Sequence, residues 1–210
     1  MEVSKRLCEA IQRENLEGVK KYLKEGADPL MRIDYETYFT PWNWLYSCQD
    51  IAITSLVLEK GKKAVNYQIP ELCDVTLIFG AVLFQDPAKI LLLIREGADI
   101  NMINENGYTP LYYTIEQSKE CRDLIPLLIE LGADITIGCK KIKEFDQESE
   151  GMKDFYSHIM KLLEGLEAKN DSRRLKIHTD RLLKIQKKTN QLPQDLLEKI
   201  EEIRDIYELD

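Results

Sequence analysis

Side chains able to do nucleophilic or metal chemistry are few in this chain of 210 residues. The two histidines, His158 and His178, have no second metal ligand at a useful spacing along the chain. The cysteines are Cys8, Cys48, Cys73, Cys121 and Cys139. Their number is odd, and no two of them have the spacing of a zinc or redox motif. We therefore expect reduced thiols, no metal ion and no cofactor.

Candidates for covalent or acid–base catalysis are equally few. Cys121 lies between two predicted helices and could be reachable, but both histidines that could activate it lie in the C-terminal part. Neighbouring carboxylates such as Glu201 and Glu202 are typical of a solvated helix face. The sequence contains no glycine-rich phosphate loop, no G-x-S-x-G elbow and no H-E-x-x-H zinc motif. It therefore predicts a protein that is not an enzyme.

The composition excludes further classes of protein. Lys and Arg number 29 and Asp and Glu 37, which gives a net charge of −8, and 44% of the residues are apolar. The apolar content is too high for a disordered chain, and the acidic balance does not attract nucleic acid through its overall field. No apolar run approaches the roughly 18 residues of a membrane span, and the N-terminal residues form an amphipathic segment rather than an export signal. We expect a cytoplasmic protein.

A repeated Gly-Ala-Asp is the strongest pattern in the sequence. It occurs at residues 26–28, 97–99 and 132–134, and a decayed copy occupies residues 61–66. The four glycines are 35, 36 and 35 residues apart. A constant period of this length predicts stacked supersecondary units.

Each of these glycines follows an apolar stretch with helical spacing. Glycine there ends a helix by taking the left-handed backbone conformation, and the following Asp or Asn suits a turn. Asn15, Asp50 and Asp86 are predicted N-caps of these helices. An earlier helix opens each unit, most clearly at Thr40-Pro41 and Thr109-Pro110. The pattern of each unit therefore predicts a turn, a short helix, a tight turn, a longer helix and then glycine.

These features resemble the ankyrin repeat family, whose unit opens with T-P-L-H-x-A. The best match runs from Asn104 through Thr109-Pro110-Leu111 to Ile135. Tyr112 stands where the family has histidine, so its hydroxyl either replaces the usual hydrogen bond or leaves it unmade. The resemblance covers residues 3–138 and implies an all-α solenoid of four units with short β-turn fingers. The fourth unit has about two extra residues around 119–121, between its helices.

The rest of the chain departs from the repeat. Residues 139–168 are interpreted as a degenerate fifth unit or a cap, in which Gly165 follows an apolar stretch. Residues 171–210 are predicted to form a helical hairpin. Its first helix, 171–189, is basic, and its second helix is acidic, so the two could pair with favourable charges. The basic helix could alternatively bind nucleic acid or an acidic membrane, in which case binding would weaken steeply with salt.

The start of the last helix also resembles the opening of an F-box, which in that family contacts the Skp-type adaptor of a cullin–RING ubiquitin ligase. The residues that carry this resemblance are Leu192, Pro193, Leu196, Leu197 and Ile200. Only ten residues follow Ile200, too few for a complete F-box. The other interpretation is a proline-started helix that packs on the repeat stack.

The family resemblance implies a concave recognition surface formed by the finger tips and the first helices. Tyr and Trp are frequent binding anchors because they bury a large area at little rotamer cost. Trp44 is expected to point inward. The candidate partner-binding residues are Tyr35, Glu36, Tyr38, Trp42, Tyr46, Asp74, Glu105, Asn106, Tyr108, Tyr112, Glu116 and Gln117.

The resulting hypothesis is a non-catalytic, monomeric module that binds a partner protein through the concave surface. The alternative is a substrate adaptor that recruits a ubiquitin ligase through the F-box-like helix. The Ile, Lys, Asn and Glu content is typical of AT-rich genomes. Ankyrin proteins of intracellular bacteria and large DNA viruses act as host-directed effectors, so the resemblance also suggests a role in a host cytoplasm.

Overall fold

The computed structural model describes residues 1–33, 39–137, 149–190 and 192–209. Within these ranges the chain is mostly helical and forms no strand beyond an isolated bridge between Ile69 and Val75, so the all-α prediction is confirmed. The chain divides into two compact units, residues 1–106 and 107–210. The predicted domain boundaries at 138 and 168 remain a prediction.

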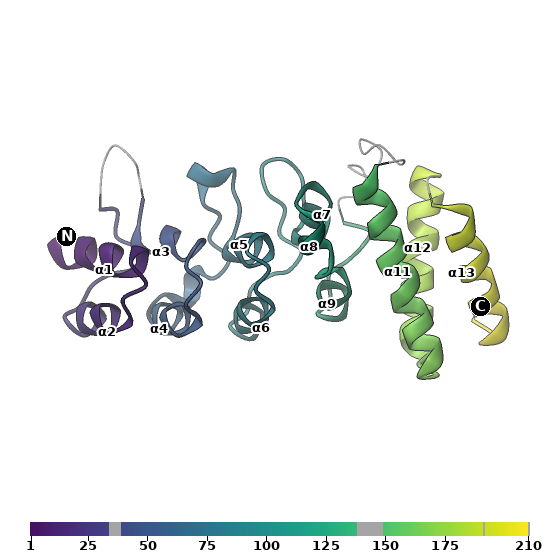
Figure 1. The fold of residues 1–210 in the computed structure, drawn as a ribbon, viewed down its shortest axis with the longest axis horizontal. Coiled ribbons are helices and arrows are strands. Elements are labelled where there is room, and N and C mark those ends of the chain that lie inside the picture. Colours follow the sequence, from purple (N-terminus) through teal and green to yellow (C-terminus); the bar gives the residue numbers. More distant parts are fainter. Residues whose placement is uncertain (34–38, 138–148, 191, 210) are drawn as a thin grey trace. The chain divides into compact units, whose positions relative to one another are not determined.

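The first unit consists of helices of at most eleven residues arranged in pairs. Figure 1 shows α1, α3 and α5 in one row and α2, α4 and α6 in a second row. The bounds are α1 Glu2–Gln12, α2 Leu16–Lys24, α3 Pro41–Trp44, α4 Ile51–Gly61, η1 Lys62–Ala64, η2 Pro70–Leu72, α5 Leu77–Leu83 and α6 Pro87–Arg95. Each helix is too short to be stable alone, so it depends on the pair it packs with.

The predicted N-caps are confirmed. The side-chain oxygens of Asn15, Asp50 and Asp86 each accept a hydrogen bond from a backbone N–H in the first turn of α2, α4 and α6. Thr40 caps α3 in the same way and is followed by proline at the first helical position. These caps set where each helix starts, because the first backbone N–H groups of a helix have no partner inside it.

Three of the four repeat glycines end their helices as predicted. Gly26, Gly97 and Gly132 have φ values of +88°, +95° and +103°, a region that other residues rarely adopt. Gly61 is different, because it is the last residue of α4 and has a φ of −116°. A Cβ atom there would lie 2.6 Å from the ring of Trp42, so this glycine makes room for an indole. The α-helix therefore ends at Gly61 as predicted, but the predicted left-handed conformation is wrong at this position.

The second unit begins with three short helices and continues with long ones. Its elements are α7 Pro110–Glu116, α8 Lys119–Arg122, α9 Ile125–Glu130, α11 Glu150–Ala168, α12 Ser172–Thr189 and α13 Gln194–Ile206. The extra residues of the fourth repeat form α8. There Cys121 is buried, which removes it as a reachable nucleophile. Arg122 of α8 pairs with Asp154 of α11 at 2.9 Å, and so ties the repeat to the long helices.

The last three helices pack on one another around a shared core (Figure 1). Leu163, Leu182 and Ile200 are fully buried, one from each helix. Gly165 lies inside α11, which continues to Ala168, so it does not end a helix as the fifth-unit interpretation requires. The described part of the segment 139–168 is one long helix, and residues 138–148 lie outside the described residues.

Candidate functional site

An open groove of about 550 Å³ lies in the first unit, between α1 and the segment that leads into α3. Its lining residues are Lys5, Cys8, Glu9, Gln12, Ile33, Phe39 and Trp44. Four come from successive turns of α1, Ile33 and Phe39 come from the segment between α2 and α3, and Trp44 belongs to α3. This residue set is called the α1 groove below.

Two stacked aromatic rings form one wall of the α1 groove. The centroids of Phe39 and Trp44 are 5.6 Å apart, and their planes are tilted by 31°. Trp44 is the last residue of α3, whose start is fixed by the Thr40 cap and Pro41. Both rings are only partly covered by the protein. Aromatic side chains held rigidly in this way can bury a large area on binding at little entropic cost.

The rim of the groove is charged, whereas its floor is neutral. Lys5, Glu9 and Gln12 of α1 are exposed and can offer donors and acceptors to a ligand. Burial raises the pKa of the Cys8 thiol to about 11, with a smaller contribution from Glu9. The thiol is therefore protonated at neutral pH and is a packing group rather than a nucleophile. This combination suits a binding surface better than a catalytic site.

A buried lysine supports the turn that follows Trp44. The Lys89 ammonium group of α6 donates to the carbonyl oxygens of Leu45 and Cys48 at 2.6 and 2.7 Å. Burial lowers the pKa of Lys89 to about 8, against the opposing effect of neighbouring anionic groups. Gly80 of α5 lets the backbone of Tyr46 approach closely, because a Cβ atom there would meet the Tyr46 carbonyl oxygen. The partly exposed aromatic residues thus stand on a tightly packed base.

A second aromatic pair lies on the same row of helices. The rings of Tyr46 and Phe84 meet edge to face with centroids 6.4 Å apart. Phe84 is 40% exposed and Tyr46 is half-buried, and the predicted partner-binding role of Tyr46 stays a prediction. The first-helix row of this unit therefore carries four aromatic side chains that are at least partly accessible.

Two of the predicted partner-binding residues belong to the core. Trp42 is fully buried against Gly61, so its predicted surface role is wrong, as is the inward direction predicted for Trp44. Tyr112 is also fully buried, and its hydroxyl donates to the Ile135 carbonyl oxygen at 2.5 Å. The tyrosine thus replaces the missing histidine and cannot contact a partner.

The remaining predicted residues belong to both units or lie outside the described residues. Tyr35, Glu36 and Tyr38 lie outside the described residues. In the first unit Asp74 is half-buried, and Glu105 and Asn106 are exposed. The residues in the second unit are Tyr108 and Gln117, both half-buried, and Glu116, which is exposed. Their binding role stays a prediction.

The sequence contains a signal that predicts the correct orientation of Trp42 and Trp44. Trp42 follows Thr40-Pro41 as Leu111 follows Thr109-Pro110, and the Leu position of the motif is a core position. Aligning the two openings would have placed Trp42 inside and left Trp44 free to reach the surface. Phe39 was missed because it precedes the helix, where no periodic pattern applies.

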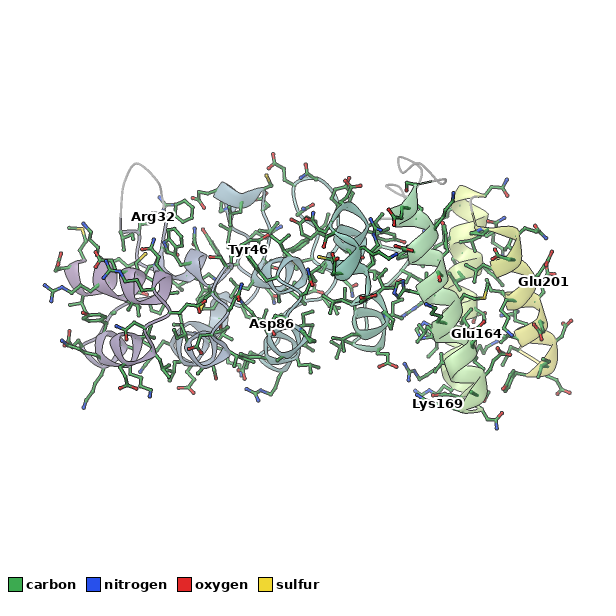
Figure 2. All side chains as sticks on the ribbon, viewed as in Figure 1. Arg32, Tyr46, Asp86, Glu164, Lys169 and Glu201 are labelled. Carbon is green, nitrogen blue, oxygen red and sulfur yellow. The ribbon has the colours of Figure 1, made fainter. Side chains whose placement is uncertain are left out.

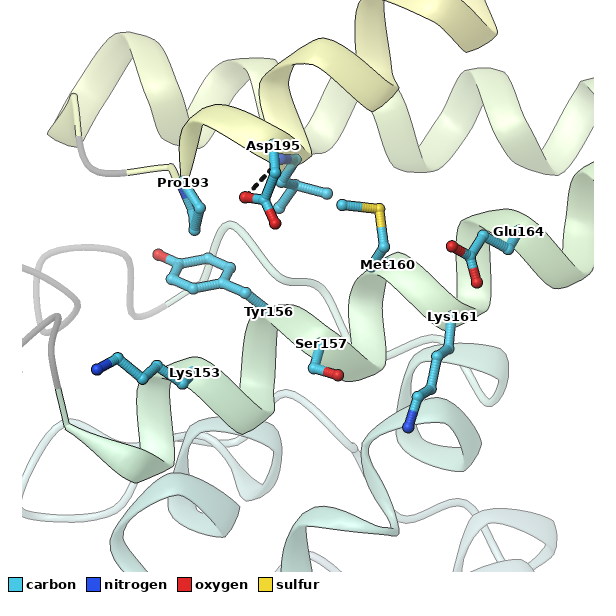
Figure 3. Close-up of a pocket in the computed structure, with 9 residues that line it drawn as sticks. Lys153, Tyr156, Ser157, Met160, Lys161, Glu164, Pro193 and Asp195 are labelled. Carbon is cyan, nitrogen blue, oxygen red and sulfur yellow. Dashed lines mark hydrogen bonds between the residues drawn. The ribbon is translucent and has the colours of Figure 1, made fainter.

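The residues of the F-box-like segment mostly face the bundle. Leu192, Leu196 and Ile200 are buried, and Leu197 is half-buried. Pro193 and Leu196 line an open groove of about 500 Å³ together with Tyr156 and Met160 of α11 (Figure 3). Three of the five predicted docking residues therefore pack in the bundle, as the interpretation of a proline-started packing helix requires, and their docking role stays a prediction.

Comparison with known proteins gives one modest similarity. No family model matches the sequence. The chain is 30% identical over 99 residues, 47% of its length, to an ankyrin repeat protein of fowlpox virus. The aligned region makes up 22% of that viral protein, so this chain spans about a fifth of its relative. The similarity supports the ankyrin repeat pattern derived from the sequence.

The described residues offer neither a metal site nor a membrane-spanning helix. Among the described residues, no three His, Cys, Asp or Glu side chains gather in a way that could hold a metal ion. None of the helices in the described ranges combines the length and the apolar character needed to cross a bilayer.

Proposed function

We propose that this chain is an ankyrin repeat protein that binds a partner protein, and that the α1 groove is its main contact site. The observation that carries the proposal is the partly exposed Phe39–Trp44 pair at the wall of an open groove. Binding energy in protein interfaces concentrates in a few rigid aromatic residues, often surrounded by a polar rim. The α1 groove has both features.

The chemistry of the groove indicates what the partner presents. An apolar or aromatic side chain would insert between the Trp44 ring and α1, where it would cover the stacked rings. Lys5, Glu9 and Gln12 would then pair with polar groups that flank this side chain. The Tyr46–Phe84 pair offers a second contact on the same row of helices.

The similarity to a poxvirus protein supports a finer proposal. We propose that the chain acts in the cytoplasm of a host cell, as a monomeric effector that holds a host protein. This role needs no catalysis, because repeat proteins of this kind act by presenting an extended surface. The ligase-adaptor alternative receives no support from the last helix, since three of its five key residues are buried.

Affinity capture from eukaryotic cell lysate tests the proposal. The wild-type chain would be compared with Phe39→Ala/Trp44→Ala, and captured proteins would be identified by mass spectrometry. The matched control is Leu91→Ala, which removes a side chain that is 49% exposed on α6, in the second row of helices. Circular dichroism confirms that each variant keeps its helices.

We expect one protein or complex to be lost from the Phe39/Trp44 variant and retained by the Leu91 control. The same set of captured proteins with all three chains would contradict the α1 groove as the contact site. Capture of ligase components by all three chains would support the adaptor role and would place the ligase contact on a surface other than this groove.

A further inference from the structure

The bundle of α11, α12 and α13 carries two exposed helix faces of opposite charge. The basic face belongs to α12 and consists of Arg173, Arg181, Lys184, Lys187 and Lys188. The acidic face belongs to α13 and consists of Glu198, Glu201, Glu202 and Asp205. All of these side chains are exposed except Arg181, which is half-buried.

The two faces do not neutralise each other within one chain. Among the described residues, Arg204 of α13 and Asp180 of α12 form an ion pair at 2.6 Å. The acidic helix thus contributes a cation to this pair, and the basic helix contributes a carboxylate. No member of the basic face forms an ion pair with any residue that the structure describes. On the acidic face, Glu202 pairs with Lys199 of its own helix, while Glu198, Glu201 and Asp205 have no ion pair with a described residue. Figure 2 labels Glu201 on α13.

The sequence suggested that the basic and acidic helices could pair with favourable charges. The two helices do pack together, but most of their charges do not meet. The inward sides of both helices are used by leucine and isoleucine packing, for example Leu182 of α12 and Ile200 of α13. The cations and carboxylates are thereby turned outward. Both faces consequently remain available to another molecule.

Their geometry is matched along the helix axis. Arg181, Lys184 and Lys188 follow one another at intervals of three and four residues, and so do Glu198, Glu201 and Asp205. Side chains at this spacing lie on one stripe of a helix with about one charge per turn. Each face also exposes one isoleucine, Ile177 at 40% on α12 and Ile206 at 62% on α13.

We propose that the basic face of α12 binds the acidic face of α13 in a second copy of this chain. A nucleic acid or an anionic membrane would satisfy only the basic face, and would bring the neighbouring carboxylates of α13 toward more negative charge. Further copies of this chain can satisfy both faces, each face through a contact with a different copy, and every such contact covers one isoleucine from each of the two chains.

This contact joins two different faces, so each bound pair leaves one basic and one acidic face free. Such a heterologous contact does not stop at a dimer. It continues from copy to copy, either into an open chain or into a closed ring. The association is weak, because exposed ion pairs each contribute little and are screened by salt. It therefore becomes visible at high protein concentration and low ionic strength, while a dilute sample remains monomeric.

Sedimentation equilibrium of the full chain tests this proposal. We expect the weight-average mass to be that of the 24.5 kDa monomer in about 1 M salt, where the Debye length is about 3 Å, and to rise beyond a dimer in about 0.02 M salt. Arg181→Glu/Lys184→Glu/Lys188→Glu should abolish this rise, as should Glu198→Lys/Glu201→Lys/Asp205→Lys. The control Lys24→Glu/Lys60→Glu/Lys63→Glu changes the same amount of exposed charge in the first unit and should retain the association.

Mixing the two reversed variants gives the decisive measurement. One has acidic residues on both faces and the other has basic residues on both, so each should be monomeric alone and the mixture should associate. A wild-type chain that stays monomeric at low salt would overturn the proposal, whatever the variants do. Association that persists in about 1 M salt, or a mixture that stays monomeric while the wild type associates, would also overturn it. Binding of the wild type to anionic vesicles or duplex DNA without self-association would assign the basic face to another ligand.

Discussion

Gly80 and Gly165 both lie inside helices, yet they have opposite surroundings. Gly80 of α5 meets the Tyr46 backbone so closely that no Cβ atom fits, whereas a Cβ atom at Gly165 of α11 would meet nothing within 4 Å. The repeat unit is therefore built on close backbone approach between short helices. The C-terminal bundle is built on side-chain packing between long helices, and tolerates change on their outer sides.

Two neighbouring leucines at the start of α13 differ in the same way, one inside the bundle core and one nearer its outer side. Leu196 is 1% exposed in the bundle core, and its neighbour Leu197 is half-buried. Leu196→Ala should lower the free energy of unfolding of the bundle by about 4 kcal/mol, because it removes buried methyl groups and leaves a cavity. Leu197→Ala should cost about 1 kcal/mol.

Urea unfolding, monitored by hydrogen exchange of the backbone amides in α11–α13, would measure the free energy of unfolding of each variant. Equal and small effects of the two substitutions would mean that α13 is a loosely attached docking helix. That result would restore the F-box-like interpretation of the segment.

Gly80→Ala tests the close approach in the repeat unit. The added methyl group overlaps the Tyr46 carbonyl oxygen, and we expect a loss of about 3 kcal/mol in the stability of the first unit. Both tryptophans lie in this unit, so the unfolding transition seen by tryptophan fluorescence reports it directly. A transition unchanged by the substitution would show that α5 does not pack against the turn after α3.

The two units should also respond to pH in different ranges, each through one buried base. Burial lowers the pKa of Lys89 from 10.5 to about 8 in the first unit. Burial, aided by Arg181 and Arg174, lowers the pKa of His178 from 6.5 to about 4 in the bundle. In both cases the unfolded chain holds the proton over a range in which the folded chain does not, so stability rises with pH through that range.

We therefore expect the first unit to gain about 3 kcal/mol between pH 8 and 10.5, and the bundle to lose about 3 kcal/mol between pH 6.5 and 4. The variants Lys89→Met and His178→Leu cannot titrate and serve as controls. Denaturant unfolding at a series of pH values, compared with each variant, isolates the contribution of the single group. A variant whose pH dependence equals that of the wild type would remove that group as the cause.

The smallest predicted effect is a gain. Gly165→Ala should stabilise the bundle by about 0.5–1 kcal/mol, because alanine restricts the unfolded chain more than glycine and finds open space in α11. Thermal unfolding monitored by circular dichroism would detect the rise in midpoint. A loss of stability would mean that Gly165 ends a helix, as the fifth-repeat interpretation requires.

The repeats could be predicted from the sequence because their signals are local. A left-handed glycine, an Asp or Asn cap and a Thr-Pro opening each act within a few residues, so Gly26, Asn15 and Thr40 gave the right helix ends. Gly61 shows the limit of this logic. Its reason is the distant ring of Trp42, which no local pattern reveals.

The candidate site was harder to predict from the sequence than the repeats. Whether Trp42 or Trp44 faces outward depends on the four-residue helix α3, which is too short for a periodic pattern to decide. In the C-terminal bundle the charge pattern of α12 and α13 suggested that they pair through opposite charges. Apolar packing determined their orientation instead, and the main charges point to solvent.

Photo-crosslinking from the α1 groove tests the central claim most directly. A photoreactive amino acid would replace Lys5, which lines the groove and is exposed, and in a matched chain it would replace Leu91 on α6. After irradiation in eukaryotic cell lysate, we predict a defined protein adduct from position 5 that is absent from position 91 and is lost when Trp44→Ala is added. An adduct from position 91 alone, or one from position 5 that persists without the Trp44 ring, would contradict a binding site in the α1 groove.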